Sequence, residues 1–262
     1  IENNTIVLPT LPEIALKVRD EAEQENTTAK RLADIITTDA AISARLLQVA
    51  NSPLYRPRTP IDNVQMAVAR LGNKLVKSLV TTLAMKQIYQ ATTDFMEKKL
   101  RKVWEDSVQV AAVSKVLAQG IASIENEQAM LAGLIHNIGI LPVLTMAEDH
   151  SDWSKNESYL EEIVNSLYPE IGTVILKNWQ FPDVLAAVPE GHRDHKRQTD
   201  DGAADYADVV MIARIQLGLD NVPDEEWSSI SAFERVGLDT DVNIVDIEDT
   251  ADEIEAVKQA IS

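Results

Sequence analysis

The chain has no cysteine among its 262 residues, and this absence excludes two kinds of site. No disulfide can form, and no metal can be held by thiolates. A chain without disulfides is compatible with a reducing compartment, so we expect a cytoplasmic protein.

Long apolar runs and several common catalytic motifs are also missing. No uninterrupted apolar run approaches the roughly 18 residues that a membrane-spanning helix needs, so we expect no membrane span. The sequence has no glycine-rich phosphate loop, no G-x-S-x-G nucleophile motif and no H-E-x-x-H metal motif. The common enzyme classes that depend on these motifs are therefore disfavoured.

Basic residues are scarce, and they are unevenly distributed. The formal net charge is −18, yet residues 45–102 hold 11 of the 24 basic residues and only 3 of the 42 acidic ones. So acidic a protein repels nucleic-acid phosphates at long range, which disfavours nucleic acid as a partner. The basic stretch predicts a surface for an acidic partner or for the chain's own acidic tail, centred on Lys98, Lys99, Arg101 and Lys102. The alternative is an ordinary solvated surface.

Almost every segment has the apolar spacing of an α-helix. Asp39 and Asp62 stand where helix caps are expected, and Pro169 is expected to interrupt a helix. Residues 128–144 form a strongly apolar helical stretch. No segment shows the strict alternation of a half-buried strand, so the sequence predicts an all-α fold.

Three parts are expected along the chain. Residues 8–92 predict an N-terminal helical lobe, and residues 93–217 predict a second helical lobe. Residues 218–262 predict an acidic C-terminal extension, because residues 238–255 include eight acidic residues and no basic one. The aliphatic residues of this extension indicate an attached segment with a final helix from about Thr250.

Two stretches carry a family resemblance. The run Leu11-Pro12-Glu13-Ile14-Ala15 is followed by the string from Asp39 to Ser52, which reads D-A-A-I-S-A-R-L-L-Q-V-A-N-S. Leu54-Tyr55 and Ala67-Val68-Ala69-Arg70-Leu71-Gly72 extend the pattern in the expected order. Over residues 8–217 the chain resembles the HDOD domain, a bacterial signalling-associated relative of the HD phosphohydrolases.

The resemblance implies an HD-domain-like helical fold, in which the N-terminal lobe packs on an HD-like lobe. It also implies where a metal site would lie, because HD proteins hold one or two divalent metals with histidines and aspartates from several helices. At the matching positions this chain has Asp106, His136, Asn137, His192 and Arg214. Tyr168 and Gly191 also stand where the family offers histidines.

The matching positions have lost groups that bind metal. Asn137 replaces the aspartate of the expected His-Asp pair, and an amide carries no negative charge to hold a divalent cation. Arg214 would place a fixed cation where a ligand belongs. We therefore expect a vestigial site with no metal, no other cofactor and no catalytic residue.

Each remaining candidate has an ordinary structural interpretation. His136 is expected to be a buried histidine with a hydrogen-bonded neighbour, and His192 an exposed loop residue. Asp106 is expected on a helix surface, and His150 and His195 are expected to be surface residues.

The resemblance predicts a non-catalytic signalling or regulatory module that binds signalling proteins or a small ligand. The alternative is a metal-dependent phosphohydrolase of the HD superfamily, in which Asp106, His136 and His192 would hold a divalent metal. A third hypothesis is that a pocket left by the lost metal binds a nucleotide or another small anion, with Arg214 as its anchor.

Overall fold

The computed structural model describes residues 6–55, 57, 59–89, 94–149, 153, 156–200 and 202–261. Throughout these residues the regular elements are helices and no strand occurs, so the predicted all-α fold class is confirmed. Two compact units divide the chain. Unit 1 comprises Ile1–Thr10 and Tyr89–Ala251, and unit 2 comprises Leu11–Ile88 and Asp252–Ser262.

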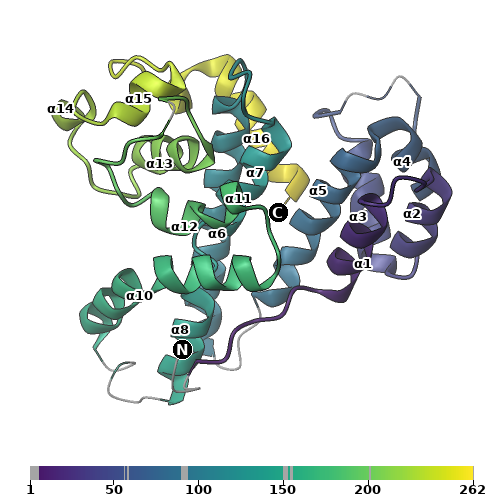
Figure 1. The fold of residues 1–262 in the computed structure, drawn as a ribbon, viewed down its shortest axis with the longest axis horizontal. Helices are drawn as coiled ribbons and strands as arrows, with labels where there is room; N and C mark the ends of the chain where they lie inside the picture. Colours follow the sequence, from purple (N-terminus) through teal and green to yellow (C-terminus); the bar gives the residue numbers. More distant parts are fainter. Residues whose placement is uncertain are drawn as a thin grey trace. The chain divides into compact units, whose positions relative to one another are not determined.

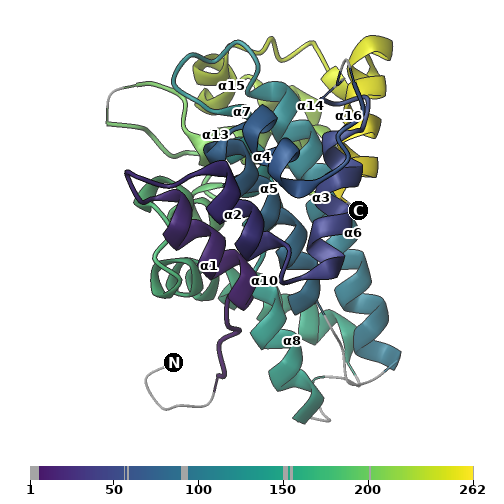
Figure 2. The ribbon, with the colours of Figure 1, turned by 90° about the vertical axis from the view of Figure 1, so that its right-hand side faces the viewer.

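Unit 2 contains the motif stretches on which the resemblance rests. Its N-terminal part consists of α1 (Glu13–Ala22), α2 (Ala29–Ile36), α3 (Ala40–Ala50), α4 (Val64–Leu71), α5 (Asn73–Met85) and the 3-10 helix η1 (Lys86–Ile88). Helix α1 packs against α5, and α2 packs against α4, as Figures 1 and 2 show. Val18, Leu32, Ile36 and Leu46 are fully buried, because the apolar faces of these short helices meet in one core.

Side-chain caps begin three helices of unit 2. The predicted cap Asp39 is confirmed, because its carboxylate accepts a hydrogen bond from the Ile42 backbone N–H at 3.0 Å. The expected cap at Asp62 is wrong. Its neighbour Asn63 caps α4 by accepting from the Met66 backbone N–H at 2.9 Å. Both side chains are suited to capping, and the backbone geometry selects the residue that precedes the first helical turn.

Asn51 connects two segments of unit 2. Its Nδ2 donates to the carbonyl oxygens of Leu47 and Ile61 at 2.9 Å, and its Oδ1 accepts from the Ile61 N–H at 2.8 Å. This amide satisfies backbone groups on both sides of the segment after α3. The motif string that ends at Ser52 therefore contributes to the fold directly.

Unit 1 is built around three helices. Its elements are α6 (Asp94–Leu117), α7 (Asn126–Ile135), α8 (Ile140–Asp149), α10 (Glu157–Asn178), α11 (Asp183–Ala186), α12 (Val188–Gly191), α13 (Tyr206–Gln216), α14 (Asp224–Trp227), α15 (Ser231–Val236) and η2 (Ile244–Asp246). Helices α6, α7 and α13 pack against one another, and α10 packs against α8 and α12 (Figure 1). A Cβ atom on Gly133 would lie 2.6 Å from the Cα of Ala111, so a glycine permits the close approach of α7 to α6.

The apolar stretch that was expected to be helical over residues 128–144 is divided into two helices. Helix α7 ends at Ile135 and α8 begins at Ile140, so His136 and Asn137 lie in the turn between them. By length and composition, the segment Asn126–Glu148 could cross a membrane, but 83% of its most apolar window is buried inside the protein. Such burial is typical of helices in a protein core.

The expected interruption at Pro169 is wrong, because α10 continues through this residue from Glu157 to Asn178. Tyr168 and Ile171 on either side of the proline are buried. Burial of this face in contact with α8 and α12 offsets the hydrogen bond that the proline cannot make.

The last helix, α16 (Glu248–Ile261), confirms the final helix expected from about Thr250. Its residues from Asp252 onward belong to unit 2. The expected boundary between residues 92 and 93 lies outside the described residues, as does His150, and the three predicted parts of the chain stay a prediction.

Candidate functional site

His136 lies directly after α7, where it is the C-terminal cap residue, and its side chain is fully buried. Its Nδ1 lies 2.6 Å from the carbonyl oxygen of Gly133. A carbonyl can only accept, so the imidazole donates from Nδ1 and its neutral form keeps a lone pair on Nε2. Arg214 on α13 donates from Nη1 to this Nε2 across 2.9 Å. The expected buried, hydrogen-bonded histidine is what the structure contains.

His192 follows α12 and is also fully buried, so its expected place in an exposed loop is wrong. Its Nδ1 lies 2.8 Å from the Val188 carbonyl oxygen, and its Nε2 lies 3.1 Å from the hydroxyl of Tyr168 on α10. The imidazole therefore donates from Nδ1 and accepts from Tyr168 at Nε2. Packing of α12 against α10 and α13 covers the ring, which local sequence composition could not reveal.

The two imidazoles lie close together. Their ring centroids are 5.1 Å apart, with an interplanar angle of 89°. Each ring has its Nδ1 directed to a backbone carbonyl, and each Nε2 already accepts from a protein side chain. Neither histidine therefore presents the unoccupied nitrogen lone pair that a metal needs.

Arg214 forms a buried ion pair with Asp220. The Arg214 Nε lies 2.9 Å from Asp220 Oδ2, and Nη2 lies 2.6 Å from Oδ1. Arg193 approaches Oδ1 through Nη1 at 3.3 Å. The side chains of Arg214 and Asp220 are 12% and 3% exposed, so this bidentate pair is shielded from water.

Asp220 was not anticipated from the sequence. It follows α13 after a turn in which Gly218 has φ +68° and the Leu219 N–H donates to the Arg214 carbonyl at 3.0 Å. Such a glycine turn closes the end of a helix and reverses the chain. An aspartate shortly after that glycine is therefore a signal that could have predicted a return contact with Arg214.

The electrostatics follow from burial and from this ion pair. Burial, and then the Arg214 cation, hold the pKa of His136 well below its usual value and lower the pKa of His192 to about 3. Burial alone would raise the pKa of Asp220, but the hydrogen bonds and charge of Arg214 outweigh it, so that pKa is lowered. The site therefore holds two neutral imidazoles and one carboxylate–guanidinium pair at neutral pH.

Asp106 contributes to the surroundings of this pair without contacting the histidines. It is half-buried on α6, and its carboxylate lies 2.6 Å from Lys102 Nζ. Burial lowers the pKa of Arg214, but the hydrogen bonds and charge of Asp220 outweigh it, and the negative charge of Asp106 adds to the increase. Asp106 therefore lies on a helix as expected, but it is partly buried near Arg214 and is not fully exposed to solvent.

Asn137 is buried and makes a different contact. Its Oδ1 accepts from the hydroxyl of Ser107 on α6 across 2.9 Å. Of the five vestigial positions, the structure thus brings His136, His192 and Arg214 together, with Asp106 nearby, whereas Asn137 connects the α7–α8 turn to α6.

The donor set does not fit the divalent metal that the HD resemblance implies. In the described part of the chain, no group of three or more histidine, aspartate or glutamate side chains is arranged to hold a metal ion. Arg214 places a permanent positive charge against His136 Nε2, and it neutralises the nearby Asp220 carboxylate. A divalent cation would meet repulsion here and few available ligands.

A second buried ionic cluster surrounds the start of α13 and has a structural role. Asp208 is fully buried, and its Oδ1 lies 2.5 Å from Arg197 Nη1 and 2.7 Å from Arg235 Nη2. Asp205 caps the helix in a reciprocal arrangement with Asp208. These contacts fasten α15 and the segment before α13 to this helix.

The predicted partner residues lie on the first half of α6, and three of them form ion pairs. Lys99 Nζ lies 2.7 Å from Glu157, Arg101 Nη2 lies 2.5 Å from Glu97, and Lys102 contacts Asp106 as described above. Lys98 is exposed. The surface is thus mixed in charge, and its binding of a partner stays a prediction.

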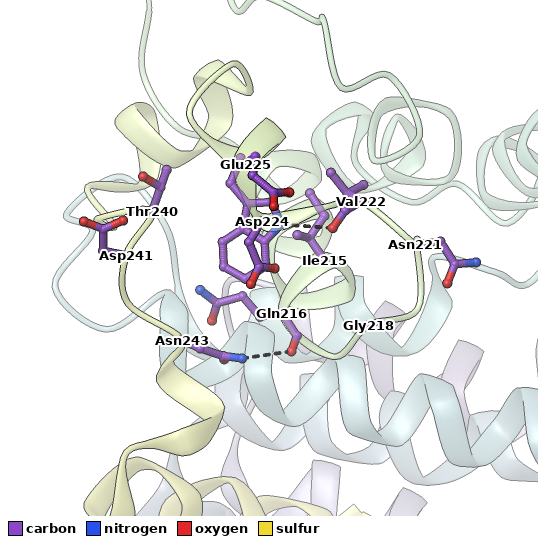
Figure 3. Close-up of a pocket in the computed structure, with 11 residues that line it drawn as sticks. Ile215, Gln216, Gly218, Asn221, Val222, Asp224, Glu225, Thr240, Asp241 and Asn243 are labelled. Carbon is purple, nitrogen blue, oxygen red and sulfur yellow. Dashed lines mark hydrogen bonds between the residues drawn. The ribbon is translucent and has the colours of Figure 1, made fainter.

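The pocket in Figure 3 is lined by residues from the end of α13, from α14 and from the segment before η2, and its volume is about 690 Å³. Asp224, Glu225 and Asp241 make it acidic. The amide of Gln216, also in its lining, donates to the Val242 carbonyl at 2.8 Å and accepts from the Ile244 N–H at 3.1 Å. Because its buried amide is already satisfied by the protein, this pocket carries no ligand assignment.

Known proteins share both the sequence pattern and the fold. The family model of the HDOD domain matches residues 8–195. A protein from Shewanella amazonensis SB2B, named as a candidate metal-dependent phosphohydrolase, is 30% identical. The structural match covers 100% of this chain and 95% of that one, with a TM-score of 0.88.

Two further solved structures share the fold at lower identity. An HDOD domain protein of unknown function from Geobacter sulfurreducens is 20% identical, with 97% of this chain and 93% of that one covered and a TM-score of 0.67. A candidate signal transduction protein from Marinobacter aquaeolei VT8 is also 20% identical, with 97% and 60% covered and a TM-score of 0.64.

A curated relative of this chain, a protein of Treponema pallidum (strain Nichols), is 22% identical over 190 residues. That match spans 36% of the relative's own length. The family model covers most of this chain, from the first motif stretch to the turn beyond His192, and the helical fold is shared along its length. The chain belongs to the HDOD domain family.

Proposed function

We propose that this chain is a non-catalytic HDOD regulatory module that acts by binding a protein or a small ligand. The observation that carries the proposal is the 2.9 Å contact between Arg214 Nη1 and His136 Nε2. The guanidinium takes the nitrogen lone pair with which an HD histidine would hold a metal, and it brings its own charge to that position. Metal-assisted hydrolysis needs a cation with an open coordination position for water, and these residues offer neither.

Metal content and hydrolysis, measured on the same untagged preparation, test this proposal. The protein is incubated separately with Mn²⁺, Fe²⁺ and Zn²⁺, desalted and analysed for metal, then assayed with a chromogenic phosphodiester. We expect substoichiometric metal and no hydrolysis above that of a His136→Ala variant, which serves as the matched control. Stoichiometric metal and hydrolysis that are both lost in His136→Ala would overturn the proposal.

The alternative function is a metal-dependent phosphohydrolase of the HD superfamily. The observation in its favour is the 30% identity to the Shewanella amazonensis protein, whose name carries that activity. Under this alternative, a metal would have to displace Arg214 from His136 and recruit Asp106 and His192. The same metal analysis therefore decides between the two functions.

A protein partner would be bound through the basic residues of α6. Lys98 and Arg101 are exposed and extend from one helix, which supports a docking role for an acidic partner surface. Replacing Lys98, Lys99, Arg101 and Lys102 with glutamate should abolish capture of partners that the wild-type chain retains. Replacing four exposed basic residues of unit 2, Lys30, Arg31, Arg70 and Lys74, with glutamate changes the net charge by the same amount and serves as the control. Equal capture by both variants would contradict this surface.

A further inference from the structure

A small pocket lies beside the Arg214–Asp220 ion pair, and both residues contribute to its lining. Its volume is about 280 Å³, and it lies entirely within unit 1. Two guanidinium groups, a carboxylate, an imidazole and two amides contribute to its lining: Arg193, Arg214, Asp220, His195, Asn165 and Asn221. The expected surface residue His195 is thus half-buried at this pocket.

The charge of the pocket is set by two cations and one carboxylate. Asp220 is only 3% exposed, and both of its oxygens accept from the Arg214 guanidinium. Arg193 reaches the same carboxylate only through Nη1, at the longer distance of 3.3 Å. The single negative charge is therefore directed mainly to Arg214, and the second guanidinium leaves an excess positive charge in the pocket.

Arg193 is positioned to meet a ligand from solvent. Its side chain is 38% exposed, and its guanidinium carbon lies 5.9 Å from the centroid of the Tyr168 ring. A guanidinium that rests over an aromatic ring keeps a defined orientation. Its planar array of N–H donors matches a phosphate or carboxylate group.

The size of the pocket limits the ligand. A volume of about 280 Å³ lies near the lower end of small-molecule sites, which span roughly 300–1,000 Å³. The net charge of −18 also disfavours polyanions, because they are repelled at long range. A small anion with one phosphate or carboxylate group fits both limits.

We propose that this pocket binds a small phosphate- or carboxylate-bearing metabolite through Arg193, with the Asn165 amide as a further hydrogen-bonding group. The inference rests on the proposed function, because it requires that the protein's own arginines hold the anion and that no metal does so. Arg214, which also lines the pocket, contacts Asp220 and His136. An anion bound at Arg193 would therefore lie next to residues that connect α13 to the end of α7.

Direct titration of the protein with inorganic phosphate, and separately with acetate, tests this inference. Binding is followed by isothermal titration calorimetry at constant ionic strength, once with EDTA and once with Mn²⁺. We expect saturable binding in EDTA by at least one of the two anions, which also tells phosphate from carboxylate chemistry. The Arg193→Gln variant should bind about tenfold more weakly, because a charge-assisted hydrogen bond is lost.

The controls separate a local contact from a change in net charge. Lys196→Gln removes the same charge three residues away, at an exposed position outside the pocket lining, and should keep the wild-type affinity. Asn165→Asp introduces a negative charge at an exposed lining residue and should also weaken binding, which guards against misfolding of the Arg193 variant.

Three outcomes would overturn the inference. Absence of saturable binding with either anion would remove the site and leave the non-catalytic function standing. Equal weakening by Arg193→Gln and Lys196→Gln would assign the effect to net charge. Binding that requires Mn²⁺ would overturn both this inference and the proposed function, because a metal would then hold the anion.

Discussion

A guanidinium at position 214 determines what the surrounding side chains can do. Arg214 occupies His136 Nε2 with one N–H and the carboxylate of Asp220 with two nitrogens. A divalent metal would polarise a bound water, whereas a guanidinium has only N–H donors and one delocalised charge. At the scale of single residues, the cluster is therefore a structural ion pair with two neutral histidines beside it.

The Arg214–Asp220 pair predicts a large and specific stability effect. Arg214→Met should lower the free energy of unfolding by about 3–5 kcal/mol, because it leaves a buried carboxylate without its partner. Urea denaturation measures this loss. The double variant Arg214→Met with Asp220→Leu should recover most of it, since no charge is then buried alone. A loss below about 1 kcal/mol in the single variant would contradict the buried pair.

The two buried histidines predict a pH dependence between pH 7 and pH 5. The folded pKa values lie below the unfolded value of about 6.5, so the unfolded chain binds more protons in this window and stability falls as the pH falls. The loss should be about 2 kcal/mol for each histidine, as measured by urea denaturation at the two pH values.

The buried carboxylates affect stability in a different, more acidic pH range than the histidines do. The pKa values of Asp208 and Asp220 are lowered, so their contribution is present above the unfolded pKa of about 3.8 and is lost only at more acidic pH. Nitrogen NMR should show both imidazoles as Nδ1–H tautomers at pH 7. Equal stability at pH 7 and pH 5, or titrating imidazole signals, would contradict the buried neutral state.

At the scale of the elements, turns rather than helices position the site. The break at residues 136–139 places His136 at the end of α7, and the glycine turn after α13 returns Asp220 to Arg214. A Cβ atom on Gly139 would lie 2.0 Å from the Tyr168 carbonyl oxygen, so only a glycine lets α8 begin against α10. The helices supply a rigid frame, and these turns bring distant side chains together.

The start of α4 offers a matched test of helix capping. Asn63→Ala should destabilise the protein by about 1 kcal/mol, because the Met66 N–H loses its acceptor. Asp62→Ala, at the neighbouring exposed position, should change stability by less than about 0.5 kcal/mol. Urea denaturation of the two variants measures the difference. A larger loss of stability in Asp62→Ala than in Asn63→Ala would identify Asp62 as the cap.

At the scale of the whole molecule, the C-terminal segment of the chain belongs to unit 2, together with the N-terminal helices. Residues Asp252–Ser262 cluster with Leu11–Ile88, which agrees with the expectation that the aliphatic residues attach this segment to the fold. In this part of α16, Ile254, Val257, Ala260 and Ile261 are buried. The apolar face of the helix thus contributes to a core, whereas Asp252 and Glu255 are exposed.

This arrangement predicts that the apolar face of α16 matters more than its charges. Ile254→Asn with Val257→Asn should lower the free energy of unfolding by at least about 3 kcal/mol, since two buried aliphatic side chains are lost. Asp252→Asn with Glu255→Gln alters the exposed face of the same helix and should cost less than about 1 kcal/mol. Thermal and urea denaturation compare the two, and equal losses would contradict an attached tail.

The amino-acid sequence by itself determined the all-helical fold, the cap at Asp39 and the family. These features depend on apolar periodicity, local hydrogen bonds or a motif that is contiguous in the chain. The cytoplasmic location and the partner surface stay predictions.

Only the tertiary structure decided which side chains of the site contact one another. His136 and Arg214 are 78 residues apart in the chain, and the burial of His192 depends on the packing of α12 against two other helices. The bidentate contact of Asp220 and the continuity of α10 through Pro169 likewise depend on packing. Local composition says which side chains can form such contacts, and the packing of distant helices selects which contacts form and which side chains water can reach.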